Sequence, residues 1–231
     1  MNNPEELQKH FGEIAALLGE KSRAAMLWNL LDGKAYTATE LATGADISPQ
    51  SASNHLLQLV QANILVVERQ GRHRYYRYFN DKVAEIIENM ASLVPAEKVS
   101  LQKSDKPSGI KYARTCYDHL AGKFGVELNN SMMKKKILIV KNNIYLVSPS
   151  GKKWFTDLGI DVEDVQNLKR KFAFPCLDWS ERKPHIGGAL GAAFLHIMLS
   201  DDWIRKVANT REVIITGKGR KELQNRLGLF I

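Results

Sequence analysis

The sequence predicts a mainly helical α+β protein with two domains, and three observations support this prediction. Apolar residues recur every three to four positions through much of residues 5–62, which is typical of amphipathic helices. An arginine-rich hairpin pattern follows at residues 64–79. A polar, aperiodic segment with two prolines and a glycine then precedes a region of strand-turn-helix patterns. We therefore expect a first domain over residues 1–95, a linker over 96–110 and an α/β domain over 111–231.

The first half of the N-terminal domain is predicted to be helical. Residues 5–18 carry one apolar stripe, formed by Leu7, Phe11, Ile14, Leu17 and Leu18. Residues 21–32 form a second helix that ends at Gly33, with its inward side chains expected to be Ala24, Ala25, Leu27, Trp28, Leu30 and Leu31.

A helix-turn-helix is predicted next. A short helix covers residues 39–42 with Thr37 as its N-cap, and Gly44 permits the turn after it. Ser48 then precedes Pro49, a residue favoured at the first position of a helix. This second helix is expected to run to about Ala62, with inward side chains Ala52, Leu56, Leu59 and Val60.

A β-hairpin and one more helix complete the predicted domain. Residues 64–69 and 74–79 are expected to be strands, and Gly71 supplies the backbone freedom that the turn between them needs. The segment DKVAEIIENMASLV is expected to be helical, with one apolar face formed by Val83, Ile86, Ile87 and Met90.

The helix after Ser48 has the features that a DNA major groove requires. The groove admits one α-helix, and polar side chains near the helix N-terminus reach the base edges. Asparagine and glutamine suit adenine, and free N–H groups at the helix start accept a phosphate. Ala52, Leu56 and Leu57 are expected to hold the helix to its support. The candidate DNA-contacting side chains are Ser48, Gln50, Ser51, Ser53, Asn54, His55 and Gln58.

The hairpin supplies positive charge close to this helix. Residues 69–77 read RQGRHRYYR, and the side chains expected to clamp phosphates or enter the minor groove are Arg69, Arg72, His73, Arg74 and Arg77. Residues 1–100 nevertheless contain 10 Lys and Arg against 12 Asp and Glu, whereas residues 101–231 contain 23 against 13. The DNA-binding prediction therefore depends on local clustering and not on the net charge of +8.

Residues 10–90 resemble the ArsR family of winged-helix repressors. The residues that carry the resemblance are Glu40-Leu41-Ala42, Ser48, Ser51, Ser53-Asn54-His55-Leu56-Leu57-Gln58-Leu59, Ala62-Asn63-Ile64-Leu65 and Gly71-Arg72-His73-Arg74-Tyr75-Tyr76. Asn63 stands where the family pattern usually has glycine, and asparagine tolerates the same left-handed backbone. The resemblance implies a homodimer on a DNA operator, joined through the first helix and the helix after the wing.

Two metal-binding patterns of that family are absent from the sequence. The stretch before the recognition helix, YTATELATGA, contains neither cysteine nor histidine, and the helix after the wing, DKVAEIIENM, contains no histidine. DNA binding itself requires no cofactor. If the protein responds to a metal ion or a small-molecule inducer, we expect the receptor in the second domain.

The second domain contains two segments rich in reactive side chains. We expect a helix from Lys111 through Met133, on which Cys116 and His119 would share a face. Residues 174–185 are expected to form an ordered loop with Cys176, Asp178 and His185, leading into a glycine-rich helix. Segments from Ile144 and Val213 also share one pattern, which similarly packed strand-turn-helix units or a chance match of common turns would explain.

Several interpretations of these segments remain open. Cys116, His119, Cys176 and His185 would form a zinc-type set if the segments meet. The sequence favours the alternative that the cysteines are core hydrophobes and the histidines are hydrogen-bonded. Two neighbouring thiols would instead form a redox-sensitive disulfide. A further alternative is an anion site at Arg114, Arg182 and His185, near the amides of Ile186, Gly187 and Gly188.

Other classes of protein have little support. No apolar run approaches the ~20 residues of a membrane span, and the acidic N-terminus lacks a signal-peptide pattern. We therefore expect a cytoplasmic protein without a membrane partner. Two cysteines are too few for a disulfide framework. Nucleotide-binding, zinc-protease and serine-hydrolase motifs are missing, and a Cys116–His119 dyad has no orienting group, so we expect no enzyme.

We therefore expect a dimeric, sequence-specific transcriptional regulator, a repressor by resemblance, with a C-terminal sensor or dimerisation domain. The alternative is a winged-helix module that binds protein instead of DNA. The four arginines of the wing favour DNA, because a protein-docking wing has little use for them.

Overall fold

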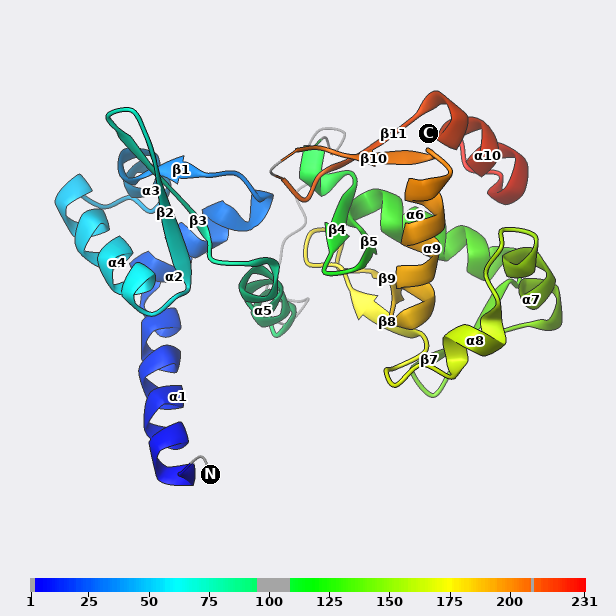
Figure 1. The fold of residues 1–231 in the computed structure, drawn as a ribbon, viewed down its shortest axis with the longest axis horizontal. Helices are drawn as coiled ribbons and strands as arrows, with labels where there is room; N and C mark the ends of the chain where they lie inside the picture. The colour runs from blue at the N-terminus through cyan, green and yellow to red at the C-terminus, as the bar shows by residue number, and fades with distance from the viewer. Residues whose placement is uncertain (1–2, 95–108, 209) are drawn as a thin grey trace. The chain divides into compact units, whose positions relative to one another are not determined.

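The computed structural model describes residues 3–94, 109–208 and 210–231. These residues divide into two compact units, residues 1–88 and residues 89–231 (Figure 1). The boundary between the units falls inside a helix, and the predicted linker over 96–110 lies almost entirely outside the described residues. Within the described ranges, no helix combines the length and the apolar character that a bilayer span requires.

The first unit is a winged helix-turn-helix. Its elements are α1 (Pro4–Gly19), α2 (Lys21–Asn29), the 3-10 turn η1 (Leu30–Asp32), β1 (Tyr36–Thr37), α3 (Ala38–Gly44), α4 (Pro49–Gln61), β2 (Leu65–Gln70), β3 (His73–Tyr78) and α5 (Asp81–Ser92). The three strands form one antiparallel sheet in the order β1-β3-β2. Strand β1 was not predicted, because a two-residue strand leaves no periodic pattern in the sequence.

Local sequence signals determine the ends of the helices. Thr37 and Glu40 form a capping box at the start of α3, and the Ser48 hydroxyl accepts a hydrogen bond from the Ser51 amide at the start of α4. Asn63 adopts a left-handed backbone with φ 54°, as the family resemblance implies. These features confirm the predicted boundaries of the helix-turn-helix.

The core of the first unit corrects three predicted positions. Met26 is fully buried, whereas Trp28 is 50% exposed and Ala24 is exposed, because the buried side of α2 is formed by Met26 and Leu27. Leu57 is 57% exposed and does not support α4. Ala52, Leu56 and Leu59 already occupy the inward face at helical spacing, and Leu57 lies outside that stripe.

The second unit alternates short hairpins with helices. Its elements are η3 (Gly109–Lys111), β4 (Arg114–Cys116), β5 (His119–Ala121), α6 (Gly122–Lys134), β6 (Leu138–Lys141), β7 (Ile144–Val147), α7 (Pro149–Thr156), α8 (Val162–Gln166), β8 (Phe174–Leu177), β9 (Pro184–Gly187), α9 (Ala189–Ser200), β10 (Ile204–Lys206), β11 (Val213–Ile215) and α10 (Gly217–Leu227). Four antiparallel hairpins result, namely β4-β5, β6-β7, β8-β9 and β10-β11.

This arrangement corrects the predicted helix and the predicted loop. Residues 114–121 form a hairpin, and helix α6 begins only at Gly122. Tyr117 adopts φ 56° in the two-residue turn, which interrupts any helix at that point. Residues 174–185, predicted as a loop, belong to the hairpin β8-β9, which continues to Gly187.

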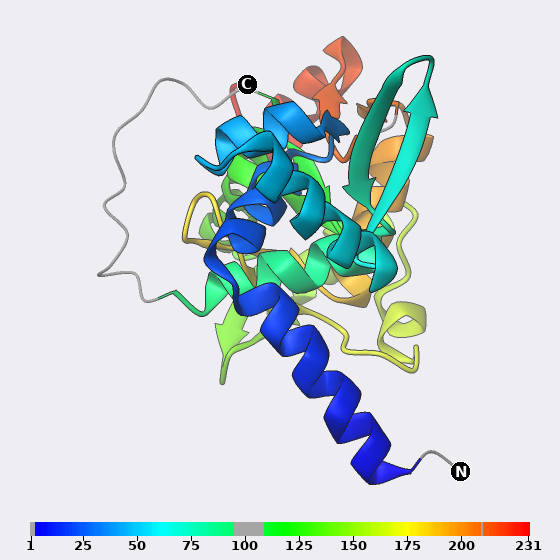
Figure 2. The same ribbon diagram turned by 90° about the vertical axis from the view of Figure 1, so that its left-hand side faces the viewer.

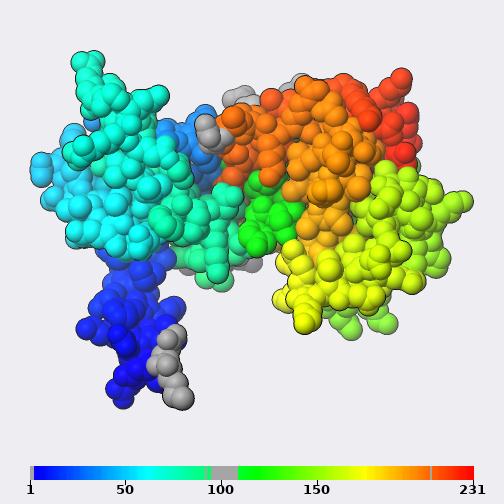
Figure 3. All heavy atoms as spheres, viewed as in Figure 1, coloured from blue at the N-terminus to red at the C-terminus, as the bar shows by residue number. Residues whose placement is uncertain are grey.

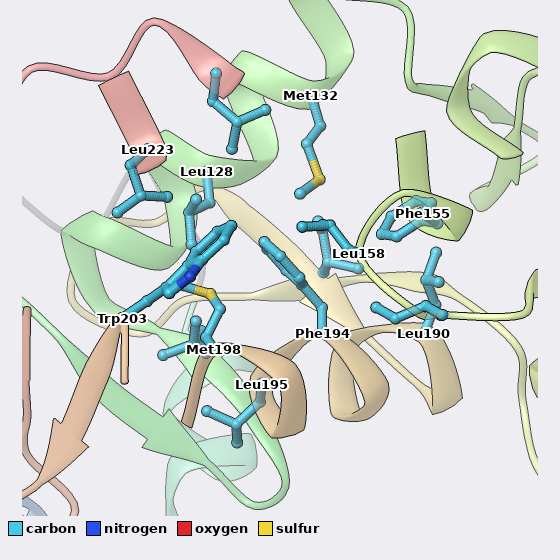
Figure 4. Packing of buried hydrophobic residues seen from close by; sticks show 14 of the residues in the cluster. Leu128, Met132, Phe155, Leu158, Leu190, Phe194, Leu195, Met198, Trp203 and Leu223 are labelled. Carbon is cyan, nitrogen blue, oxygen red and sulfur yellow. The ribbon is translucent and has the colours of Figure 1, made fainter. Parts of the chain in front are cut away.

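One apolar cluster holds the second unit together. Helices α6 and α9 contribute Leu128 and Phe194, which pack with Trp203 near the middle of the cluster (Figure 4). Trp154, Phe155 and Phe194 add edge-to-face ring contacts, with centroids 5.0 to 6.2 Å apart. These ring contacts join α7 to α9.

The weak sequence repeat proves to be part of a larger structural repeat. The order hairpin, helix, hairpin, helix occurs first as β4-β5-α6-β6-β7-α7 and again as β8-β9-α9-β10-β11-α10. The second helix of each half has an equivalent cap: the Ser148 hydroxyl accepts from the Gly151 amide, and the Thr216 hydroxyl from the Gly219 amide, both at 2.9 Å. The first helix of each half begins beside a left-handed glycine, Gly122 or Gly188.

Candidate functional site

Helix α4 presents a polar face to solvent. Gln50, Ser53 and Asn54 are exposed on it, and Leu57 lies on the same side of the helix. The Ser53 hydroxyl donates a hydrogen bond to the carbonyl oxygen of Pro49 at 2.9 Å. Gln50 and Asn54 are therefore the predicted α4 residues with the long amide side chains best placed to reach a ligand.

Two predicted DNA-contacting residues are held from within the unit. The Arg23 guanidinium lies 3.1 Å from Nδ1 of His55 and donates to the Gln58 side-chain oxygen at 2.9 Å. Oε2 of Glu20 lies 3.8 Å from Nδ1 of His55. His55 is partly buried, so its place is at the contact between α2 and α4. Arg23 was not predicted, because His55 and Gln58 lie more than 30 residues from it in the sequence.

The wing concentrates four arginines on one hairpin. Arg69 lies directly opposite Arg74 in the β2-β3 ladder, a like-charge pairing that is unfavourable in the isolated protein. Among the described residues, no ion pair engages Arg69, Arg72 or Arg74, whereas Arg77 pairs with Glu68. The hairpin extends beyond the helices of its unit (Figure 2). An anionic partner would relieve the repulsion at its tip.

Helix α1 exposes its apolar stripe. Leu7, Phe11 and Ile14 are 63%, 72% and 37% exposed, and no residue of α1 is buried. The helix projects away from the other helices of its unit (Figure 3). An isolated helix of this length is marginally stable in water, so the stripe requires a covering surface.

The second unit brings together the four predicted metal-ligand candidates. One ligand atom from each of Cys116, His119, Cys176 and His185 lies within 4.8 Å of all the others. Both cysteines are thiols. The two histidines and Cys116 are buried, and Cys176 is partly buried. Asp178, the third reactive side chain named in the predicted loop, lies outside this set.

Each histidine of the cluster lies between a second imidazole and a carboxylate. The Nε2 atoms of His119 and His185 are 3.1 Å apart. Nδ1 of His119 lies 3.4 Å from Asp118, and Nδ1 of His185 lies 3.6 Å from Asp178. Burial lowers the pKa of His119, but hydrogen bonds with Asp118 and Cys116 outweigh this effect and raise the pKa to about 9.

The carboxylates are themselves fixed by arginines. Asp178 forms a fully buried ion pair with Arg114 at 2.8 Å, and Asp118 pairs with Arg170 at 2.5 Å. Burial raises the pKa of Asp178, but the Arg114 charge and the hydrogen bond from Ser180 lower it to about 2. Asp118 and Arg170 were missed, although the recurrence of Cys-x-Asp at 116–118 and 176–178 could have indicated the aspartate.

The predicted anion site does not form. Arg114 is engaged by Asp178, and Arg182 donates to the carbonyl oxygens of Ala91 and Val94. Ile186 and Gly187 belong to strand β9, where both are paired with β8. Two of the three amides expected at a helix start therefore lie in a hairpin, because α9 begins only at Ala189 with Gly188 as its N-cap.

Comparisons with known proteins support the helix-turn-helix of the first unit. Residues 18–68 match a family model described as a helix-turn-helix domain. The chain is 41% identical over 226 residues to YdfF of Bacillus subtilis strain 168, an uncharacterised HTH-type transcriptional regulator. The match covers 97% of this chain and 100% of YdfF.

Solved structures match the N-terminal part of the chain at lower similarity. The winged helix-turn-helix DNA-binding domain of Mb0332 from Mycobacterium bovis, described as homodimeric and as a possible ArsR-family regulator, is 20% identical. It covers 46% of this chain and 96% of its own, with a TM-score of 0.37. NolR from Sinorhizobium fredii is also 20% identical, covering 41% and 95%, with a TM-score of 0.35.

The full-length similarity to YdfF includes the second unit as well as the helix-turn-helix. The first unit has the DNA-binding winged architecture, and the function class is regulation of transcription, not catalysis. The chain belongs to the HTH-type transcriptional regulators.

Proposed function

We propose that the protein is a cytoplasmic repressor that binds a specific duplex DNA operator as a homodimer. The observation that carries the proposal is the arginine cluster on the wing, beside a helix with an exposed polar face. Arg69 and Arg74 face each other without an acidic partner among the described residues. The phosphates of a DNA backbone neutralise such a pair of arginines, whereas docking of a protein does not require two arginines side by side.

Helix α4 supports sequence-specific reading of the major groove. Gln50 and Asn54 are one helical turn apart, and each carries an amide that can bond to adenine in bidentate form. Leu57 continues the same face and offers an apolar contact for a thymine methyl group. Arg23 holds Gln58 and His55 at the inner edge of this face, so they orient the helix.

A salt titration with matched variants tests the roles of wing and helix. Arg72→Ala with Arg74→Ala should weaken binding to every duplex and flatten the slope of log K against log salt by about 1–2 units. Asn54→Ala should cost roughly 1–3 kcal/mol on a duplex enriched from a random library, and much less on random DNA. Both are measured by fluorescence anisotropy.

Two controls separate these effects from general loss of charge or of folding. Lys134→Ala with Lys135→Ala removes two exposed charges from α6 and its C-cap and should leave the slope unchanged. Gln61→Ala changes an exposed residue at the far end of α4 and should retain selectivity. An unchanged slope in the wing variant would favour the protein-docking alternative. Equal losses on both duplexes for Asn54→Ala would show that the residue does not read bases.

The exposed stripe of α1 supports the homodimer. Leu7→Ser with Phe11→Ser should convert a dimer to a monomer in sedimentation velocity, because the two side chains are 63% and 72% exposed in one chain. Loss of the dimer should also lower the affinity for the operator, since a dimer binds two half-sites. Lys9→Ser with Ala16→Ser alters the opposite face and should leave the dimer intact. A dimer that survives the first pair of changes contradicts the role of α1.

A further inference from the structure

The four-residue cluster of the second unit is assembled from two equivalent hairpins. Cys116 is the direct cross-strand partner of His119 in β4-β5, and Cys176 is the direct partner of His185 in β8-β9. Direct partners in an antiparallel ladder project to the same side of the sheet. Each hairpin therefore presents one sulfur and one imidazole to the same point.

The structural repeat reproduces the surroundings of the cluster in each half. Cys-x-Asp occurs at residues 116–118 and again at 176–178, and each aspartate lies near Nδ1 of the histidine in its own half. The arginine that pairs with each aspartate comes from outside its hairpin strands. Arg114 of β4 pairs with Asp178, which connects the two halves, and Arg170, from the segment between α8 and β8, pairs with Asp118.

Close packing of glycines fixes the histidines. A Cβ at Gly191 would lie 3.0 Å from the Cβ of His119, and a Cβ at Gly125 would lie 3.6 Å from that of His185. Each histidine thus packs against the glycine of the other half's helix. A Cβ at Gly187 would lie 3.1 Å from the Cβ of Cys176. Side chains held this tightly are preorganised around one point.

The orientation of the two histidine rings brings their Nε2 atoms close together. A carboxylate only accepts hydrogen bonds, so Asp118 and Asp178 favour a proton on Nδ1 of each ring. With both rings neutral, the two Nε2 lone pairs face each other across 3.1 Å, so a proton or a metal ion must lie between the rings. His185 is 1% exposed, and its Nδ1 has no hydrogen-bond partner within the described residues, Asp178 being just beyond bonding distance. A cation between the rings would satisfy both Nε2 atoms.

We propose that Cys116, His119, Cys176 and His185 bind one Zn²⁺ ion in a closed tetrahedral site, with Asp118 and Asp178 as its outer carboxylates. Two thiolates and two imidazoles are the donor set of structural zinc sites, and no carboxylate belongs to the set. Zn–N bonds of 2.0–2.1 Å place two nitrogens about 3.3 Å apart in a tetrahedron, close to the 3.1 Å observed. Histidine ligands with Nδ1 near a carboxylate are typical of such sites.

Zinc would join the two halves of the second unit. A two-stranded hairpin is marginally stable alone, and the ion would connect β4-β5 to β8-β9 through four bonds. Binding releases the thiol protons, and any proton held between the two imidazoles, to solvent, and it stabilises the folded state in proportion to RT ln(1 + [L]/Kd). Because no ligand belongs to residues 1–88, metal binding and DNA binding can succeed or fail independently.

Metal analysis of the full-length protein, purified under reducing conditions, tests the proposal. We expect one zinc per chain, a fall in Tm after chelation, and recovery of Tm when Zn²⁺ is restored. Co²⁺ added to the stripped protein should produce the visible absorption and the thiolate charge-transfer band of a tetrahedral sulfur-ligated ion. Cys176→Ser, at a partly buried position, should remove the charge-transfer band of one thiolate and lower metal affinity.

Two further variants distinguish a metal site from simple packing. Asp118→Asn should lower Co²⁺ affinity about 10–100-fold while the protein stays folded. His196→Gln alters an exposed histidine on α9 and should bind Co²⁺ like the parent. A folded, reduced protein that takes up neither metal and has a chelator-insensitive Tm overturns the proposal. The same holds if Cys176→Ser leaves the Co²⁺ spectrum unchanged.

Discussion

Asp178→Asn is expected to lower the free energy of unfolding of residues 89–231 by about 3–5 kcal/mol, measured without metal in the presence of chelator. The substitution removes the negative charge but keeps the side-chain volume. Arg114, 1% exposed, would then carry a buried positive charge without its ion-pair partner. Asp178 also accepts hydrogen bonds from the Gly122, Ser180 and Glu181 amides, so part of the turn after β8 depends on it.

Urea unfolding followed by tryptophan fluorescence measures this effect. Trp154, Trp179 and Trp203 all belong to the second unit, and Trp179 stacks beneath the Arg114 guanidinium at 4.8 Å. Asp201→Asn, an exposed substitution after α9, should stay within about 0.5 kcal/mol of the parent. Arg114→Met with Asp178→Leu should recover part of the loss, since neither charge remains buried. A loss below about 1 kcal/mol for Asp178→Asn would contradict the importance of the pair.

The first unit could be predicted from sequence because its signals are local. The Thr37–Glu40 capping box, the Ser48-Pro49 helix start and the positive φ of Gly71 each lie within a few residues of the feature that they determine. The exposure of Leu57 was not predictable from its residue type. Only the position of Ala52, Leu56 and Leu59 in the folded unit shows which face of α4 is inward.

The second unit was predicted less well because its determinants are distant in the sequence. Tyr117 in a left-handed turn breaks the expected helix, although tyrosine is uncommon in that conformation. Arg114 and Asp178 are 64 residues apart, and no local pattern relates them. The residue types of the Cys2His2 set could be named from the sequence. That the two segments meet depends on how the halves of the repeat pack.

Part of the structural repeat could be recognised in the sequence. The match between the segments from Ile144 and Val213 is now explained by α7 and α10, which begin with equivalent caps. A longer comparison would also have aligned His119-Leu120-Ala121-Gly122 with His185-Ile186-Gly187-Gly188. Those segments end the first hairpin of each half, and they place one histidine from each half at the cluster.

Gly191→Ala is expected to destabilise the second unit by about 3 kcal/mol, against the intrinsic preference of a helix for alanine. Alanine normally stabilises a helix interior by up to about 1 kcal/mol relative to glycine. A Cβ at Gly191 would, however, lie 2.3 Å from the carbonyl oxygen of Ile186, a backbone atom that cannot rotate away. Helix α9 would have to move from strand β9, and overpacking of this kind costs about 1–3 kcal/mol or more.

The same substitution also distinguishes packing from metal binding. Because the new Cβ would press on the Cβ of His119, Co²⁺ affinity of the full-length protein should fall together with the urea midpoint. Gly217→Ala, at the start of α10, meets no atom within 4 Å and should leave both quantities near the parent values. Equal behaviour of the two variants would show that α9 adjusts without cost. A stability loss with unchanged Co²⁺ affinity would show that His119 tolerates movement of the helix, and the four-ligand geometry would then be less tightly constrained than the glycine contacts indicate.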